Sequence, residues 1–232
     1  MKRKLAVFDI DGTIFRSSLF IELLHELIRN GKVEGKVLKS VEKDYLAWLN
    51  RRGTYSNYAN KLVEIYNKVI VGLREDDIKK AARKVIQEQK GKVYRFTRDL
   101  IKDLKNKEYF LLAVSGSPNH IVAEFVRHYE FDEYFATEHE IIDGVFTNIV
   151  GGVRFEKRGI LERFLQKHPE LNIKTSIGIG DTESDIAFLK KVNFPIAFNP
   201  SVGLAKYAKS RGWRIIVERK DVVYDVKNFK II

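Results

Sequence analysis

The stretch LAVFDIDGT, residues 5–13, decides the fold. Its apolar run Leu5–Phe8 is typical of a strand buried on both faces, as in a parallel sheet. Two carboxylates, Asp9 and Asp11, follow at the strand end where open parallel sheets bind their ligands. Burying carboxylates is costly unless something neutralises them, and a divalent cation held by Asp9, with a phosphate opposite it, would do so. The alternative is an ordinary strand that ends in an Asp-Gly turn.

Two further apolar runs end in similar polar segments, which favours the ligand site. Phe110–Val114 runs into Ser115-Gly116-Ser117-Pro118, and Ser176–Ile179 runs into the segment Gly180–Asp185. In one sheet these strand ends would be neighbours, so that four carboxylates, a hydroxyl and backbone N–H groups would gather there. Oxygen ligands suit a hard divalent cation, and N–H groups suit a phosphate.

In their order and spacing these motifs resemble the haloacid dehalogenase superfamily of phosphohydrolases. The residues that carry the resemblance are Asp9–Thr13, Ser115-Gly116, Lys157, and Gly180-Asp181 with Asp185. Within the superfamily the chain is most similar to the phosphoserine-phosphatase-like branch. Two features support this similarity: the segment Lys157–Phe164, and the pair Gly212-Trp213 followed by an apolar run. The resemblance implies a phosphoric monoester hydrolase with a helical cap between its first and second motifs.

A long helical insert separates the first two predicted core strands. Amphipathic helices are predicted at 18–30, 37–50, 58–71 and 76–89. A crossover between parallel strands needs only about a dozen residues, so these roughly eighty residues exceed a simple connection. We therefore predict a helical cap over residues 16–92 and a core made of residues 1–15 and 93–232.

Strands and helices alternate in the remainder of the chain. Helices are predicted at 97–107, 119–129, 159–167 and 202–210, and short strands at 195–198 and 214–217. The region 134–155 is strand-like, with turns expected at Asp143-Gly144 and Gly151-Gly152. This alternation predicts a doubly wound, parallel-sheet (Rossmann-like) α/β core.

Composition narrows the class of protein. The 232 residues include no Cys, which excludes disulfides, a thiol nucleophile and a Cys-based zinc site. No apolar run reaches about eighteen residues, so no membrane span is expected. The N-terminal residues do not resemble a signal peptide, and we expect a cytoplasmic protein. The absence of Cys, the single Met and the abundant Lys, Arg and Glu favour a thermophilic source. Five His residues show no metal-like spacing.

Basic charge is concentrated in the insert. Residues 16–95 contain 18 Lys and Arg and 10 Asp and Glu, a net charge of +8 out of +11 for the chain. This excess fits a lid that attracts an anionic substrate, a nucleic-acid or acidic-membrane surface, or merely solvated helix faces. The aromatic residues Tyr45, Trp48, Tyr55 and Tyr58 lie among these charges. Helical core spacing explains Tyr45 and Trp48 at least as well as base stacking does.

The residue types suggest a mechanism. Asp9 would attack phosphorus and form an aspartyl-phosphate, which divides the reaction into two easier steps. Mg²⁺ would cancel the charge that opposes this attack. Asp11 would act as general acid and then as general base. The resemblance implies that Mg²⁺ is bound by Asp9, the Asp11 carbonyl and Asp181, with Asp185 nearby, and that the phosphoryl oxygens contact Ser115, Gly116 and Lys157.

The substrate differs from the one expected for this branch. Phosphoserine phosphatases carry a substrate-reading Glu where this chain has Ser18, the candidate substrate residue, and an Arg where residues 60–65 contain none. Ser184 also replaces the usual Asn. The first two departures argue against serine phosphate, and the basic insert favours a more anionic small phosphate ester, such as a sugar, lipid or nucleotide phosphate. A phosphotransferase or phosphomutase with the same intermediate, and a basic nucleic-acid-binding protein on this fold, stay open as alternatives.

Overall fold

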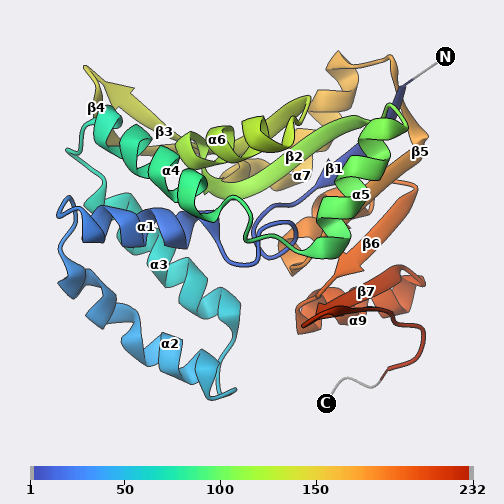
Figure 1. Cartoon of the computed structure of the whole chain (residues 1–232), viewed down its shortest axis with the longest axis horizontal. Helices are drawn as coiled ribbons and strands as arrows, with labels where there is room; N and C mark the ends of the chain where they lie inside the picture. Colours follow the sequence, from blue (N-terminus) through green and yellow to red (C-terminus); the bar gives the residue numbers. More distant parts are fainter. Residues whose placement is uncertain (1–2, 230–232) are drawn as a thin grey trace.

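The computed structural model describes residues 3–229, without the side chains of residues 154–158. One sheet runs through the described chain in the order β4-β3-β2-β1-β5-β6-β7-β8 (Figure 1). Its inner pairings are parallel, and only the edge strands β4 and β8 run antiparallel to their neighbours. The strands are β1 (Arg3–Phe8), β2 (Phe110–Pro118), β3 (Glu133–Ile142), β4 (Val145–Gly152), β5 (Leu171–Gly180), β6 (Phe194–Phe198), β7 (Arg214–Arg219) and β8 (Val222–Asp225).

Helices cover both faces of the sheet, which confirms the predicted doubly wound α/β core. They are α1 (Leu19–Arg29), α2 (Glu42–Leu49), α3 (Tyr55–Val69), α4 (Glu75–Gln89), α5 (Arg95–Asn106), α6 (Asn119–Tyr129), α7 (Val153–Lys167), α8 (Ile186–Leu189) and α9 (Val202–Arg211), with the 3₁₀ turns η1 (Gly35–Val41) and η2 (Glu183–Asp185). No helix within residues 3–229 is long and apolar enough to cross a membrane.

Strand β1 contributes side chains to both hydrophobic cores, because both of its faces are buried. Ala6 and Phe8 belong to the core beneath α5 and α6, whereas Leu5 and Val7 belong to the core beneath α7, α8 and α9. All four side chains are fully buried. Successive side chains of a strand point to opposite faces, so this short apolar run holds the two layers of helices together.

The insert α1–α4 shares the first of these cores instead of forming its own. Leu23, Leu62 and Val85, from α1, α3 and α4, are fully buried in the same cluster as Phe8. Figure 1 shows α1 and α4 close to the sheet and α2 farthest from it. Helix α2 has no buried residue. The insert therefore has an anchored part, α1 and α4, and an outlying part, η1 and α2.

Backbone hydrogen bonds attach the anchored part at two places. The turn between α3 and α4 pairs with the β3–β4 hairpin: the Gly72 N–H donates to the Phe146 carbonyl (2.9 Å), and the Glu75 N–H to the Gly144 carbonyl (2.8 Å). The two connections to the core pair with each other, since the Arg16 N–H donates to the Lys92 carbonyl (2.8 Å).

Some predicted boundaries are wrong. The helix expected at 37–50 is divided into η1 and α2. The helix expected from 58 begins at Tyr55, because the Thr54 hydroxyl caps it by accepting from the Asn57 N–H (3.2 Å). Gly151-Gly152 is not a turn between strands. Instead β4 continues to Gly152 and α7 begins directly afterwards, six residues before the predicted Gly159.

Gly152 explains that last difference. It has φ +79°, a conformation that favours glycine, and a Cβ there would lie 2.4 Å from the Ala136 carbonyl oxygen. The residue therefore turns the chain sharply from strand into helix. The hairpin turn predicted at Asp143-Gly144 is confirmed: both residues have positive φ, as a two-residue turn of this kind requires.

Candidate active site

Three neighbouring strands carry the predicted motifs to one edge of the sheet. β1 lies between β2 and β5, and Phe8 is in register with Ala113 on one side and Ile179 on the other. The Asp9 N–H donates to the Ile179 carbonyl (2.9 Å), so the first aspartate still belongs to the sheet. Parallel strands end at the same edge, and the segments that follow β1, β2 and β5 therefore meet there.

Asp9, Asp181 and Asp185 form a carboxylate cluster at this edge. One oxygen from each lies within 4.8 Å of the others. Asp9 is 4% exposed and Asp185 is fully buried. Carboxylates so close and so buried repel one another strongly unless a cation neutralises them. Their all-oxygen donor set fits a hard divalent cation.

Asp185 also holds the loop that carries Asp181. Its Oδ2 accepts from the N–H groups of Asp181 (3.1 Å) and Thr182 (2.9 Å) and from the Thr182 hydroxyl (3.1 Å). Gly180 permits this fold, because a Cβ there would lie 2.6 Å from the Asp185 Cβ. Asp185 therefore positions Asp181 whether or not it contacts a metal.

The turn after β1 approaches the same loop. Gly12 has φ +81°, and a Cβ there would lie 2.2 Å from the Asp181 Oδ2. Only glycine combines this backbone conformation with this contact. Asp11-Gly12 is therefore a turn, as the alternative interpretation of the sequence predicted. The turn also contacts an acidic side chain, Asp181, from the loop after β5.

Asp11 lies outside the carboxylate cluster and is fixed by hydroxyl and amide donors. Its Oδ1 accepts from the Leu19 N–H at the start of α1 (2.6 Å), and its Oδ2 accepts from the Ser115 hydroxyl (2.6 Å). The Ser117 oxygen lies 2.9 Å from both carboxylate oxygens and accepts from the Phe20 N–H (3.1 Å). Asp11 thus joins β2 to the N-terminus of α1.

Ser117 is a residue that the sequence reasoning missed. The sequence analysis gives it no role, yet its hydroxyl lies within hydrogen-bond distance of the second aspartate, as that of Ser115 does. Alternation along β2 was the available signal, because residues 115 and 117 share one face of a strand.

The predicted phosphate ligands differ in their surroundings. Ser115 is fully buried and its hydroxyl donates to Asp11. Gly116 is exposed, and a Cβ there would meet nothing within 4 Å, which leaves room beside its backbone. The side chain of Lys157 lies outside the described part of the chain. Its role therefore stays a prediction.

A cavity of about 450 Å³ adjoins these residues. Asp11, Gly12 and Asp181 line one end of it. The remaining lining consists of Arg16, Ser17, Ile21, Glu22, His25, Asn199 and the rings of Tyr45, Trp48, Tyr55, Tyr58 and Tyr94. The volume lies in the range of small-ligand sites. Tyr45 and Trp48 therefore face a cavity, although helical spacing had allowed them to be core residues.

The candidate substrate residue Ser18 lies behind the cavity wall. It is 6% exposed, and its neighbour Ser17 lines the cavity instead. Burial, with the charges of Asp11 and Asp181, raises the pKa of Tyr55 above its usual value.

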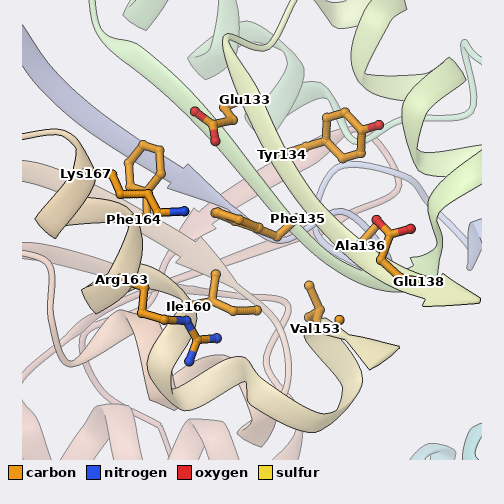
Figure 2. A pocket seen from close by; sticks show the side chains of 11 residues that line it. Glu133, Tyr134, Phe135, Ala136, Glu138, Val153, Ile160, Arg163, Phe164 and Lys167 are labelled. Carbon is orange, nitrogen blue, oxygen red and sulfur yellow. The ribbon is translucent and has the colours of Figure 1, made fainter. Parts of the chain in front are cut away.

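A second cavity, of about 250 Å³, lies between β3 and α7 (Figure 2). Phe135, Ile160 and Phe164 form its apolar part, and Glu133, Arg163 and Lys167 lie around it. None of the predicted site residues lines it. The larger cavity at the ends of β1 and β5 is therefore the candidate active site.

Comparisons with known proteins agree with this geometry. The model of the family described as haloacid dehalogenase-like hydrolase matches residues 6–190. A phosphoserine phosphatase from Methanocaldococcus jannaschii is 25% identical over 231 residues, which cover 99% of each chain. These findings confirm the resemblance inferred from the motifs.

Two solved structures share the fold. A protein of unknown function from Bordetella pertussis Tohama I has a TM-score of 0.73 at 22% identity, and the match covers 93% of this chain and 98% of that one. A phospho-aspartyl intermediate analogue of phosphoserine phosphatase has a TM-score of 0.64 at 23% identity, with 95% and 96% covered.

Proposed function

Since this chain belongs to the haloacid dehalogenase-like hydrolase family, we propose that it is a Mg²⁺-dependent phosphatase. It hydrolyses a small phosphate monoester through an aspartyl-phosphate on Asp9. The observation that carries the proposal is the cluster of Asp9, Asp181 and Asp185 at the ends of β1 and β5. The relationship to a phosphoserine phosphatase supports the reaction class.

The acidic residues fit the metal that the family implies. Asp9 and Asp181 would hold Mg²⁺ with the Asp11 carbonyl, and Asp185 would keep the Asp181 loop in place. Bound Mg²⁺ withdraws negative charge from phosphoryl oxygens and so lowers the repulsion that an attacking carboxylate meets.

Asp9 and Asp11 divide the chemistry between them. Asp9, on the sheet, is the nucleophile, and its phosphorylation splits hydrolysis into two steps. Asp11 gives a proton to the leaving oxygen and then takes one from the attacking water. Its four close donor contacts, from Leu19, Ser115 and Ser117, hold its carboxylate in one orientation at the cavity.

The remaining assignments follow from position. Ser115, Gly116 and Lys157 bind phosphoryl oxygens. Helices α1–α4 act as the cap, which spans residues 16–92, and residues 1–15 and 93–232 form the core. Water is the proposed acceptor of the phosphoryl group. Transfer to another acceptor uses the same intermediate, and the ratio of free to transferred phosphate decides between them.

The test is phosphate release from a panel of phosphate monoesters, L-phosphoserine included, with Mg²⁺ and with EDTA. We expect release that requires Mg²⁺ and is absent from Asp9→Asn. The matched control is Asp99→Asn, an exposed aspartate on α5, which should keep full activity. Release that persists in Asp9→Asn would overturn the proposal.

A further inference from the structure

Four aromatic residues of the insert form one continuous surface in the cavity, which we call the aromatic wall: Tyr45, Trp48, Tyr55 and Tyr58. Trp48 and Tyr58 are stacked, with ring planes 5° apart and centroids 5.9 Å apart. Tyr55 lies 5.3 Å from Trp48, and Tyr45 lies 5.2 Å from Tyr58. Tyr94 faces the same cavity from the connection between insert and core.

Helix packing accounts for only part of the aromatic wall: Tyr58 is buried in the first core and Trp48 packs against it, but the other two rings stay accessible. Tyr45 and Tyr55 are 39% and 36% exposed, and α2, which carries Tyr45 and Trp48, has no buried residue. The same helix leaves Leu46 and Leu49 about half exposed. Rings on a helix that packs so little are costly to leave beside water, so a ligand that covers them would bind favourably.

The aromatic wall lines the same cavity as two of the site carboxylates. Asp11 and Asp181 line it together with all four rings. Tyr55 is close enough to Asp11 and Asp181 for their charges to affect it. A phosphate bound at the strand ends therefore has its ester group directed among the rings.

Apart from Asp11 and Asp181, which face the phosphate, the charged residues of the cavity are Glu22 and Arg16, and they disfavour a cationic ester group, the other common occupant of aromatic pockets. Glu22 already accepts from Lys92 (2.8 Å) and Gln89 (3.0 Å). Arg16 also lines the cavity, and within residues 3–229, side chains 154–158 aside, no acidic oxygen lies within 4.0 Å of its guanidinium. Its one ring contact is with Tyr94, 5.7 Å away.

We propose that the substrate's leaving group carries a planar aromatic ring that stacks on the aromatic wall, as in a nucleoside monophosphate or an aralkyl phosphate. This rests on the proposed phosphatase function. Stacking of a base on a protein ring contributes free energy that corresponds to at least about fivefold in affinity. The proposal also explains why the residues that read serine phosphate are missing.

Tryptophan fluorescence tests the binding directly. The chain has two tryptophans, and Trp213 packs on Tyr207 (5.1 Å) in the core. In the double variant Asp9→Asn, Trp213→Phe, Trp48 is the only tryptophan and turnover is blocked. The probes are benzyl phosphate, its non-aromatic match cyclohexylmethyl phosphate, AMP and phosphocholine, each with Mg²⁺.

Benzyl phosphate or AMP should change the Trp48 emission and bind about tenfold tighter than cyclohexylmethyl phosphate. The tighter of the two identifies the source of the ring. Equal affinity for benzyl and cyclohexylmethyl phosphate, or tightest binding of phosphocholine, would overturn the proposal.

A measurement of turnover is the second test of the proposal. In Trp48→Ala, the ratio of kcat/KM for benzyl over cyclohexylmethyl phosphate should fall about tenfold. Leu49→Ala, on the same helix but outside the cavity, should leave it unchanged. Hydrolysis with no aromatic preference in the wild type contradicts this inference alone. Aromatic binding without hydrolysis of any ester contradicts the phosphatase function, and with it the leaving-group assignment, and supports only an aromatic-binding site at the aromatic wall.

Discussion

The site has two groups of residues that are built differently: the carboxylates Asp9, Asp11, Asp181 and Asp185, which we call the carboxylate end, and the aromatic wall, which we call the aromatic end. The carboxylate end comes from residues directly after β1, β2 and β5, and its aspartates are held by buried hydrogen bonds. The aromatic end comes from α2 and the start of α3, where α2 has no buried residue and the rings of Tyr45 and Tyr55 are more than a third exposed. Rigid elements thus carry the groups that need exact placement, and the loosely packed segment carries the surface that contacts the variable part of a substrate.

Asp9→Asn should have the largest effect, because it removes the nucleophile. Activity should fall by at least about 10³-fold. Without Mg²⁺ the variant should be more stable than the wild type, because one charge of a repelling cluster is gone. Thermal unfolding with and without Mg²⁺ checks this. If Mg²⁺ stabilises both proteins equally, the cluster is not the metal site.

Gly12→Ala tests whether the carboxylate end depends on close approach. The new Cβ would displace Asp181, so activity should fall by about 10²-fold. Gly72→Ala is a matched control, since Gly72 has a similar φ of +84° but nothing within 4 Å of a Cβ. Both variants should lose about 1 kcal/mol of stability. Equal loss of activity in both would show that the Asp181 contact is unimportant.

Ser117→Ala tests the orientation of Asp11. It removes a buried hydroxyl that contacts both Asp11 oxygens and the Phe20 N–H. We expect kcat to fall about tenfold and the free energy of unfolding to fall by about 1–3 kcal/mol. Ser210→Ala, which removes an exposed hydroxyl on α9, is the control. Unchanged kcat in Ser117→Ala would mean that the hydrogen bonds from Ser115 and Leu19 are enough to orient Asp11.

The smallest effect concerns the anchored part of the insert. Hydrogen bonds from Lys79 and from His120 lower the pKa of Glu75, which joins α4 to α6. A carboxyl with a lowered pKa stabilises the fold above its unfolded pKa, and this contribution disappears as the pH falls through the folded value. The stability difference between wild type and Glu75→Gln should therefore be present at neutral pH, decline below the usual pKa of 4.5, and be absent once the pH lies below the lowered pKa of the folded state.

Asp76→Asn is the control for that comparison. It removes a neighbouring carboxylate from the same first turn of α4, so its effect on the interaction with the helix dipole should equal that of Glu75→Gln. Urea unfolding at several pH values measures both variants. If their pH profiles coincide, the contacts of Glu75 with Lys79 and His120 contribute nothing to stability.

The sequence predicted the core better than the insert. The helix at 119–129 and the Asp143-Gly144 turn are as expected, because strong periodicity and turn chemistry act locally. The 37–50 helix and the Gly151-Gly152 turn were wrong, because contacts with distant segments decide them, such as the Ala136 carbonyl beside Gly152. The cytoplasmic location, the thermophilic source and the Lys157 role stay predictions.

By itself the sequence determined the carboxylate end of the site. Apolar runs that must be buried become strands, and the polar residues directly after Phe8 and Ile179 are then carried to one edge of the sheet. Only the tertiary structure decided that Ser117 holds Asp11, that Ser17 replaces Ser18 at the cavity, and that Tyr45 and Trp48 face it. Helical spacing identifies a face, but how α2 and α3 pack determines whether that face meets a core or a cavity.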